Sequence, residues 1–83
     1  MKRNIYAIRD VKSGFLSPIV DDTDQQAVRN FGFSCSKSDT LLNFAPEDYS
    51  LYLLGTFDTA SGKISPSNLP ELVIQATDLV SHD

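Results

Sequence analysis

Apolar and polar positions in the first twenty residues follow a pattern that predicts a β-hairpin. Residues 4–9 (NIYAIR) are β-branched and aromatic and put apolar side chains on both faces, as in a strand that is covered on both sides or central in a sheet. Residues 15–20 form a second apolar run. Because Pro18 removes a ladder donor from this run, we expect a bent or edge strand. Residues 10–14 (DVKSG) form the predicted turn between the two strands.

Residues 21–31 (DDTDQQAVRNF) carry the strongest helical signal in the chain. Thr23 is placed to act as the N-cap, with Gln26 three residues later, and Asp24 falls in the first turn, where the helix dipole favours negative charge. Apolar residues recur at helical spacing and are expected to face the sheet: Ala27, Val28 and Phe31. Gly32 follows directly, which predicts a C-terminal cap and a helix of two to three turns.

Residues 33–44 combine a serine-rich loop with three large apolar side chains. We expect this segment to cross the domain as a connection and to bury those three side chains beneath it: Leu41, Leu42 and Phe44. Pro46 has a fixed backbone angle and is expected to begin a single helical turn. The two acids of this turn, Glu47 and Asp48, are expected to be structural rather than catalytic.

A second hairpin is predicted after this turn. Residues 50–57 (SLYLLGTF) are typical of a strand, in which Gly55 indicates a bulge or the close approach of another backbone. Residues 58–62 (DTASG) repeat the D-x-x-S-G pattern of residues 10–14. In such turns the aspartate accepts hydrogen bonds from backbone amides and the glycine takes a positive φ angle. The return strand is expected to start at residues 63–65.

The last twenty residues complete the predicted fold. Residues 66–70 (PSNLP) begin and end with a proline, which predicts a break. Residues 71–80 fit both a helix and a strand, and β-branching favours a strand over residues 72–76. The predicted fold class is α+β: a small, mostly antiparallel sheet made of two hairpins and a terminal strand, with one short helix packed on it in a ββαββ-like order. Residues 1–83 are expected to form a single domain.

Length and composition narrow the choice of protein class. A chain of 83 residues buries only about 60–65% of the surface that its unfolded form exposes, which favours a homo-oligomer as a source of further core. We expect neither a membrane span nor a signal peptide, since no apolar run approaches the roughly 20 residues that cross a bilayer. The single cysteine, Cys35, cannot form an internal disulfide, which fits a reducing cytoplasm.

The net charge of −4 is unevenly distributed along the chain. Residues 1–37 carry six basic and four acidic residues, a net charge of +2, whereas residues 38–83 carry one basic and seven acidic residues, a net charge of −6. An acidic protein is a poor nonspecific ligand of nucleic acid, because that affinity comes mainly from phosphate neutralisation. A basic half on an acidic body can still bind nucleic acid locally, or it can pair with the acidic half of another copy.

The chain shows no pattern that is typical of an enzyme. It contains no nucleophile–base pair, no glycine-rich phosphate loop and no cluster of metal ligands, so we expect neither catalysis nor a cofactor. Cys35 is expected to be a small buried apolar residue rather than a nucleophile. His82, the only histidine, lies next to the C-terminal residue, where chains fray. A catalytic pair of these two residues is therefore not expected.

Three segments together point to a known family: YAIRDVK at residues 6–12, AVRNF at residues 27–31 and PEDYSLYLLGTFD at residues 46–58. With these segments the chain resembles the small nonstructural protein of gokushoviruses, which are tailless single-stranded DNA phages of the Microviridae. The turn at residues 61–62 is Ser-Gly where that family usually has Thr-Gly. The resemblance covers nearly the whole chain. It implies a non-enzymatic role in phage genome replication or packaging, in the cytoplasm of the infected bacterium.

Two hypotheses follow for the function. The first is binding of single-stranded DNA, since the family is often labelled DNA-binding. In a strand, Tyr6 shares its face with Lys2 and Lys12, which would let its ring stack on a base beside phosphate contacts. The alternative for Tyr6 is a place in the core, with the basic residues as a solvated face. The candidate DNA-binding residues are the aromatic ring and the basic side chains of the N-terminal half: Lys2, Arg3, Tyr6, Arg9, Lys12, Arg29 and Lys37.

The second hypothesis is a protein–protein interaction module. The acidic C-terminal half and the small core favour a homo-oligomer that docks on a phage or host replication or assembly protein, such as a replication or capsid protein. A strand of the second hairpin would then pair with its symmetry mate. The two hypotheses are compatible, because a dimer can join two weak basic patches into one surface.

Overall fold

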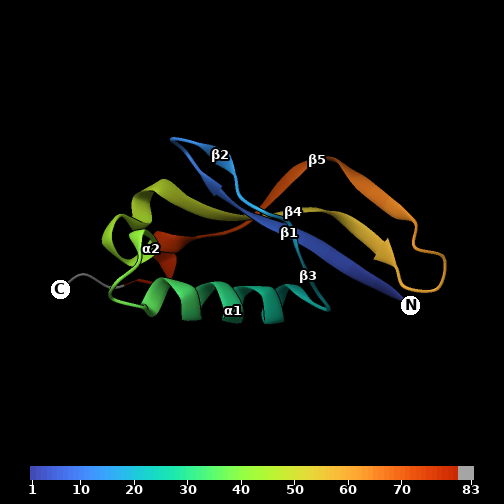
Figure 1. Ribbon diagram of the computed structural model, residues 1–83, viewed down its shortest axis with the longest axis horizontal. Coiled ribbons are helices and arrows are strands. Elements are labelled where there is room, and N and C mark those ends of the chain that lie inside the picture. Colours follow the sequence, from blue (N-terminus) through green and yellow to red (C-terminus); the bar gives the residue numbers. More distant parts are fainter. Residues whose placement is uncertain (81–83) are drawn as a thin grey trace.

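An antiparallel sheet of five strands packs one of its faces against a helix of 13 residues (Figure 1). The computed structural model describes residues 1–80. Neighbouring strands follow the order β2-β1-β4-β5, and β3 pairs with β1 beyond the end of β2. The strands are β1 (Lys2–Asp10), β2 (Gly14–Phe15), β3 (Ile19–Asp21), β4 (Tyr49–Asp58) and β5 (Ile64–Gln75). The predicted α+β class, with a small antiparallel sheet and one packed helix, is confirmed.

The two predicted hairpin turns have the same internal structure. The Asp10 carboxylate accepts a hydrogen bond from the Lys12 amide at 2.9 Å, and the Asp58 carboxylate accepts one from the Ala60 amide at 2.9 Å. These amides are the main reason why the pKa of both carboxyl groups is lowered. Both closing glycines have positive φ angles, 102° at Gly14 and 78° at Gly62. The repeated D-x-x-S-G pattern is therefore confirmed as a turn signal.

The outer strand of the first hairpin is interrupted, as Pro18 predicts. The chain pairs with β1 before the proline as β2 and after it as β3, so that residues 15–20 form a bent edge. On its other side β1 pairs with β4 along its whole length, from Lys2 opposite Asp58 to Asp10 opposite Tyr49. The first strands of the two hairpins are therefore the central pair of the sheet.

The predicted break at residues 66–70 is wrong, because β5 continues across it. Gly55 pairs with Pro66 and Leu53 pairs with Glu71, so residues 67–70 face a single residue of β4 and bulge out of the ladder. The predicted return strand and the predicted terminal strand are thus two halves of one strand. This strand ends at Gln75, and a 3₁₀ turn, η2 (Ala76–Asp78), follows it.

The helix α1 (Asp24–Ser36) begins as predicted and ends later. The Thr23 hydroxyl oxygen accepts a hydrogen bond from the Gln26 amide at 3.1 Å, which confirms the N-cap. The predicted end at Gly32 is wrong, since the helix continues for another turn. Its buried stripe extends beyond the glycine: Ala27, Phe31 and Cys35. Burial of Cys35 outweighs the roughly 1 kcal/mol that glycine costs inside a helix.

The core lies between α1 and the sheet. Its largest fully buried side chains are Tyr6 of β1, Leu51 of β4 and Cys35 of α1. Leu51 pairs with Ile8 on one side and with Ile74 on the other, so three strands contribute to the same layer. The sheet face under α1 is therefore apolar over the length that the helix covers.

Two short helical segments connect α1 to β4: α2 (Leu41–Phe44) and η1 (Pro46–Asp48). The turn at Pro46 is confirmed. The predicted burial of three apolar side chains is wrong for two of them, because Leu41 is 67% and Phe44 79% exposed, and Leu42 packs against the core. The Thr40 hydroxyl caps α2 by accepting a hydrogen bond from the Asn43 amide at 3.3 Å. A single capped turn can direct only one side to the core.

The sheet is longer than the helix, which makes the molecule elongated, with extents of 46 × 22 × 18 Å. The first half of β1, the end of β4 and the start of β5 project beyond the N-terminal end of α1 (Figure 1). We call this projecting part, residues 2–5, 55–58 and 64–66, the arm.

Candidate nucleic-acid interface

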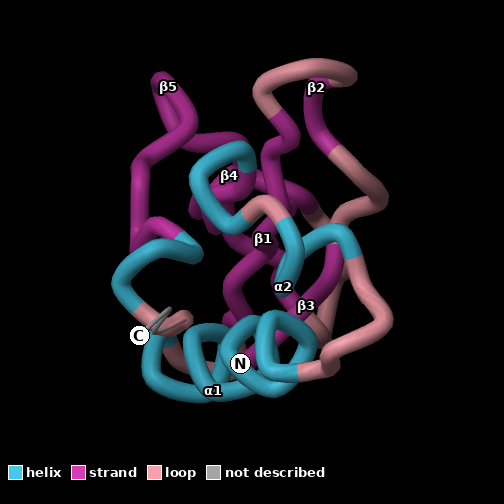
Figure 2. The backbone as a smooth tube through the Cα atoms, turned by 90° about the vertical axis from the view of Figure 1, so that its left-hand side faces the viewer, coloured by secondary structure: helices cyan, strands magenta, loops and turns pink. Residues whose placement is uncertain are grey.

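The face of the sheet opposite α1 carries no helix, and we call it the open face. Figure 2 shows the backbone of β2 and of β5 rising on either side of β4 on this side of the molecule. Residues that are paired across neighbouring strands point to the same face of the sheet. The register therefore shows which residues belong to the open face, and they form four rows across the strands. From the arm to the other end these rows are Arg3, Phe57 and Ile64; Val20, Ile5, Gly55 and Pro66; Ala7, Tyr52 and Leu72; and Phe15, Arg9, Ser50 and Gln75.

The open face is apolar and aromatic although no helix covers it. The other face of the sheet is apolar only where α1 lies on it. Beyond the helix, that other face becomes polar: Lys2, Asn4, Thr56, Asp58 and Ser65. The chain therefore places polar residues at uncovered sheet positions on one side and large apolar residues at uncovered positions on the other. Such an uncovered apolar face is typical of an interaction surface.

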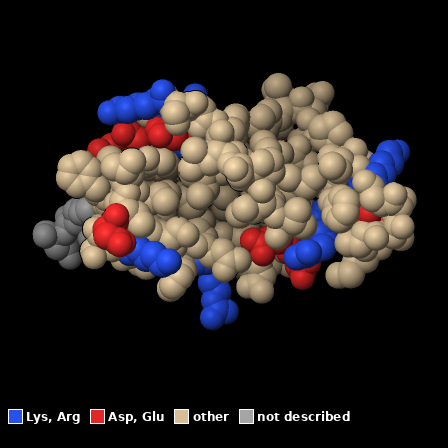
Figure 3. Space-filling view, viewed as in Figure 1, with Lys and Arg blue, Asp and Glu red and all other residues tan. Residues whose placement is uncertain are grey.

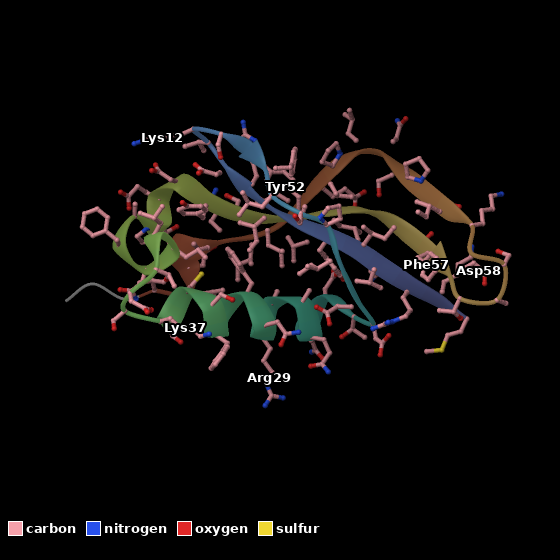
Figure 4. All side chains as sticks on the ribbon, viewed as in Figure 1. Lys12, Arg29, Lys37, Tyr52, Phe57 and Asp58 are labelled. Carbon is pink, nitrogen blue, oxygen red and sulfur yellow. The ribbon has the colours of Figure 1, made fainter. Side chains whose placement is uncertain are left out.

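Two aromatic residues and an arginine occupy neighbouring positions on the open face, and we call them the platform (Arg9, Phe15 and Tyr52). The rings of Phe15 and Tyr52 meet edge to face, with centroids 5.5 Å apart and an interplanar angle of 82°. Arg9 pairs with Phe15 on one side and with Ser50 on the other, and it forms no ion pair among residues 1–80. Figure 4 shows Tyr52 near the middle of the sheet. Aromatic faces next to a cation are the groups that stack on bases and contact phosphates.

The predicted stacking role of Tyr6 is wrong. Its side chain is fully buried under α1, where its hydroxyl donates a hydrogen bond to Asp24 and accepts one from the Asn4 amide at 3.0 Å. Burial and the hydrogen bond to Asp24 raise the pKa of Tyr6 to about 12. The alternative reading, Tyr6 as a core residue, is the one that the structure supports. A buried ring cannot stack on a base.

The basic residues among the predicted DNA-binding positions do not form one surface. Arg29 points from α1 away from the sheet, whereas Lys12 lies at the turn between β1 and β2 (Figure 4). Lys37 sits at the C-terminal end of α1, with its amino group 4.8 Å from the centre of the Phe33 ring. Figure 3 shows the basic side chains of this view scattered and mostly next to acids. Of the predicted basic residues, Arg9 belongs to the platform.

Several of these cations have acidic partners. The Arg3 Nε lies 2.6 Å from the Asp22 carboxylate, and the Lys12 Nζ lies 3.6 Å from that of Asp48. Lys2 pairs with Asp58 across β1 and β4, and its charge contributes to the lowered pKa of that carboxyl group. Three of the six basic residues of the N-terminal half thus lie near acids. The ion pairs among residues 1–80 do not include the other three, Arg9, Arg29 and Lys37.

The two platform aromatics were missed because their position depends on strand register. Phe15 follows the first turn directly, and Tyr52 lies in the strand that was predicted over residues 50–57. Neither position reveals by itself which sheet face the helix covers. The alternation of residues 51–54 left both faces apolar, so only the pairing of β1 with β4 separates Leu51 from Tyr52.

Other chemistry is sparse in the described chain. Residues 1–80 contain no group of three or more histidine, cysteine or acidic side chains that could hold a metal ion. Within the same residues, no helix is long and apolar enough to cross a membrane. Cys35 is buried, and burial raises the pKa of its thiol. The predictions about His82 fall outside the described residues.

Comparison with known proteins gives one family. The family model described as Phage ORF5 protein matches residues 3–79. No curated protein and no solved structure matches the chain. The match extends from the second residue of β1 to the residue after η2, so it includes the platform, the core and the arm apart from Lys2. The chain belongs to the Phage ORF5 protein family.

Proposed function

We propose that this phage protein is a non-enzymatic accessory factor that binds single-stranded DNA on its open face during viral genome replication or packaging. The observation that supports the proposal is the platform, in which the rings of Phe15 and Tyr52 meet on the open face and Arg9, which forms no ion pair among residues 1–80, is the strand partner of Phe15. The finer assignment to the nonstructural proteins of gokushoviruses rests on the segments at residues 6–12, 27–31 and 46–58. The protein would then act in the cytoplasm of the infected bacterium.

The platform has the chemistry that single-stranded nucleic acid requires. Stacking on an aromatic ring contributes about 1–3 kcal/mol for each base and tolerates any sequence, because every base has a π-face. Single-stranded DNA exposes its bases for such contacts, whereas a duplex does not. Arg9 would then contact a phosphate next to the stacked base. The proposal therefore favours single-stranded over double-stranded DNA.

Electrostatics limit the strength of this binding. The net charge of the protein is −4, so long-range attraction to a polyanion is weak. Lys12 adds a mobile cation near the platform, since its side chain is 78% exposed and its pair with Asp48 is long, at 3.6 Å. Exposed pairs of this kind contribute little stability and exchange readily with a phosphate. The Asp10 carboxylate, by contrast, is held in the turn, because it accepts hydrogen bonds from the backbone amide of Lys12 and from the hydroxyl of Ser13.

Fluorescence anisotropy with a labelled single-stranded oligonucleotide tests the proposal. We expect binding at low salt that weakens as salt rises. Tyr52→Ala should weaken binding by roughly 5- to 150-fold, which corresponds to one lost stacking contact. Arg9→Gln should weaken binding and lower the slope of log K against log salt by about 0.7, since one phosphate contact is lost.

Two variants on the other side of the molecule serve as matched controls. Arg29→Gln removes the same charge from the outer side of α1, and Phe33→Ala removes an exposed ring from the same helix. Neither should change the affinity by more than the small effect of net charge. Absence of binding at low salt, or an equal loss in Arg9→Gln and Arg29→Gln, would contradict the proposal.

A protein–protein interaction module that regulates a phage or host replication or assembly protein is the second candidate function. It is favoured by the apolar character of the open face and by the exposed side chains of α2, Leu41 and Phe44. The anisotropy experiment separates the two candidates. A folded protein that fails to bind single-stranded DNA at low salt would leave the interaction module as the better explanation of the open face.

A further inference from the structure

The charged residues of the open face are both arginines. The four rows of this face contain Arg3 and Arg9, and no position in these rows of the described chain is an aspartate or a glutamate. The whole protein carries 11 acidic and 7 basic residues, with a net charge of −4. An acidic molecule thus keeps its acids out of the rows of one sheet face. Such a face complements an anionic ligand.

Each of these arginines has a phenylalanine as its cross-strand partner. Arg9 pairs with Phe15 of β2 and belongs to the platform, whereas Arg3 pairs with Phe57 of β4 at the arm. The two arginines are six residues apart on the same strand, which corresponds to about 20 Å at roughly 3.3 Å per residue. Figure 4 shows Phe57 towards the tip of the sheet and Tyr52 near its middle. The arm therefore repeats, at the other end of β1, the combination of arginine and aromatic ring that the platform contains.

The arm is also the positive end of the chain. Residues 1–5 and 55–66, which include the turn at its tip, carry three basic residues and one acidic residue, a net charge of +2: Lys2, Arg3, Lys63 and Asp58. The remaining residues carry four basic and ten acidic residues, a net charge of −6. Lys63 is exposed and is not among the ion pairs of residues 1–80. Attraction to a polyanion is therefore stronger at the arm than over the rest of the molecule.

The ion pair of Arg3 does not prevent it from binding a ligand. Its Nε atom lies 2.6 Å from the Asp22 carboxylate, and the two side chains are 38% and 52% exposed. Because exposed pairs of this kind contribute little stability, a phosphate can replace the carboxylate at small cost. Phe57 is half-buried, as Tyr52 is. The arm thus offers the same two groups as the platform, a partly accessible ring and a cation that can exchange its partner.

We propose that Arg3 and Phe57, which we call the arm subsite, bind the same single-stranded DNA as the platform, so that one strand spans the open face. This inference rests on the proposed function, since it takes single-stranded DNA as the ligand of the platform. Phe57 stacks on a base and Arg3 contacts a neighbouring phosphate. Because the two sites are about 20 Å apart, several nucleotides lie between them, and only a sufficiently long strand reaches both.

Fluorescence anisotropy with labelled single strands of two lengths tests the inference on the full chain. A strand of about 3 nucleotides occupies one site, whereas one of about 12 falls within the range of about 4–16 nucleotides that single domains cover. Phe57→Leu keeps apolar bulk but lacks a π-face, and it should weaken binding of the longer strand by about fivefold or more. Arg3→Gln should lower the salt slope for the longer strand by about 0.7. Both variants should affect the shorter strand less, because the platform remains.

Asp22→Asn provides an independent test that does not remove a binding group. It frees Arg3 from its ion pair and should therefore tighten binding of the longer strand. Asp39→Asn is the matched control, because it removes the same charge from an exposed position between α1 and α2. It should tighten binding less than Asp22→Asn does. Circular dichroism should show all variants folded, and the two aspartate variants decide the matter if Phe57→Leu unfolds.

The outcomes separate this inference from the proposed function. If Tyr52→Ala weakens binding of the longer strand and Phe57→Leu does not, the DNA stays at the platform, which overturns the arm subsite and leaves the proposed function standing. Equal effects of Asp22→Asn and Asp39→Asn would also overturn the arm subsite. Absence of binding to either strand at low salt would contradict the proposed function and the arm subsite together.

Discussion

Gly55 in β4 lies directly against Ser65 in β5. A Cβ atom at residue 55 would stand 2.4 Å from the Ser65 carbonyl oxygen and 2.8 Å from the Cα atom of Pro66. Both contacts involve backbone, which cannot rotate away as the end of a side chain can. The close approach of another backbone, one of the two explanations predicted for this glycine, is therefore confirmed, and the ladder is also irregular next to it.

Gly55→Ala should destabilise the protein by about 1–3 kcal/mol, because the β4–β5 ladder has to move apart to admit the methyl group. For a domain of this size that corresponds to a decrease in Tm of roughly 4–8 °C for each kcal/mol. Thermal unfolding followed by circular dichroism measures the change.

Gly32→Ala is the control for this prediction. A Cβ atom at residue 32 would meet the Leu79 side chain at 3.6 Å, which is an ordinary van der Waals distance. Since alanine is the better helix former, this variant should be neutral or more stable by up to about 1 kcal/mol. Equal destabilisation by both variants would show that the contact with Ser65 is not the cause.

Thr23→Ala should cost about 1 kcal/mol, because it removes the hydroxyl oxygen that accepts the Gln26 amide at 3.1 Å. Thr23→Ser keeps the hydroxyl and should retain most of the stability. Urea unfolding midpoints of the two variants provide the comparison. A midpoint for Thr23→Ser as low as that for Thr23→Ala would contradict the capping role.

The local features of this fold could be predicted from the sequence because they depend on near neighbours. The D-x-x-S-G turns, the Thr23 cap and the edge at Pro18 each need only a few residues and their backbone preferences. The turn at Pro46 belongs to the same group. These features specified the two hairpins and the α+β class before any long-range contact was known.

The candidate site could not be predicted, because it depends on which face of β1 the helix covers. Tyr6 and Ala7 are both fully buried, although they lie on opposite faces of the strand. Their alternation in the sequence therefore gives no indication of the side on which α1 packs. Once the helix lies over Tyr6, that ring becomes core and Tyr52 belongs to the other face. The end of α1 was missed for a similar reason, since burial of Cys35 is a tertiary contact.

Cys35 should react slowly with thiol reagents in the native protein. Its side chain is fully buried, and burial raises the pKa of the thiol, so that less of the reactive thiolate is present at neutral pH. We expect the labelling rate in the native protein to be lower than in denaturant by at least roughly a hundredfold. This is the ratio for a thiol that reacts only in the unfolded state of a small domain with about 3 kcal/mol of stability. Equal rates in both conditions would contradict the buried position.

The hydrogen bond between Tyr6 and Asp24 should make the protein sensitive to alkaline pH. The pKa of Tyr6 is about 12 in the folded protein, compared with 10.0 for an unperturbed tyrosine, because burial and the bond to Asp24 favour the protonated phenol. A group whose pKa is raised by folding stabilises the protein fully below its unfolded pKa, and this contribution is lost as pH rises towards the folded pKa. The free energy of unfolding should therefore decrease between pH 10 and about 12. Urea unfolding at a series of pH values measures this decrease.

Tyr6→Phe should be less stable at neutral pH by about 1 kcal/mol, since the phenol hydrogen bonds are lost, and its stability should fall less steeply in the alkaline window. Some slope should remain, because the pKa of Tyr49 is raised as well, by burial and by the Asp10 carboxylate. Tyr52→Phe is the control, since this variant removes a phenol from the open face and leaves the buried Tyr6 hydroxyl and its bond to Asp24 in place. If Tyr6→Phe retained the same slope as the unmodified protein, the buried phenol would not be the titrating group.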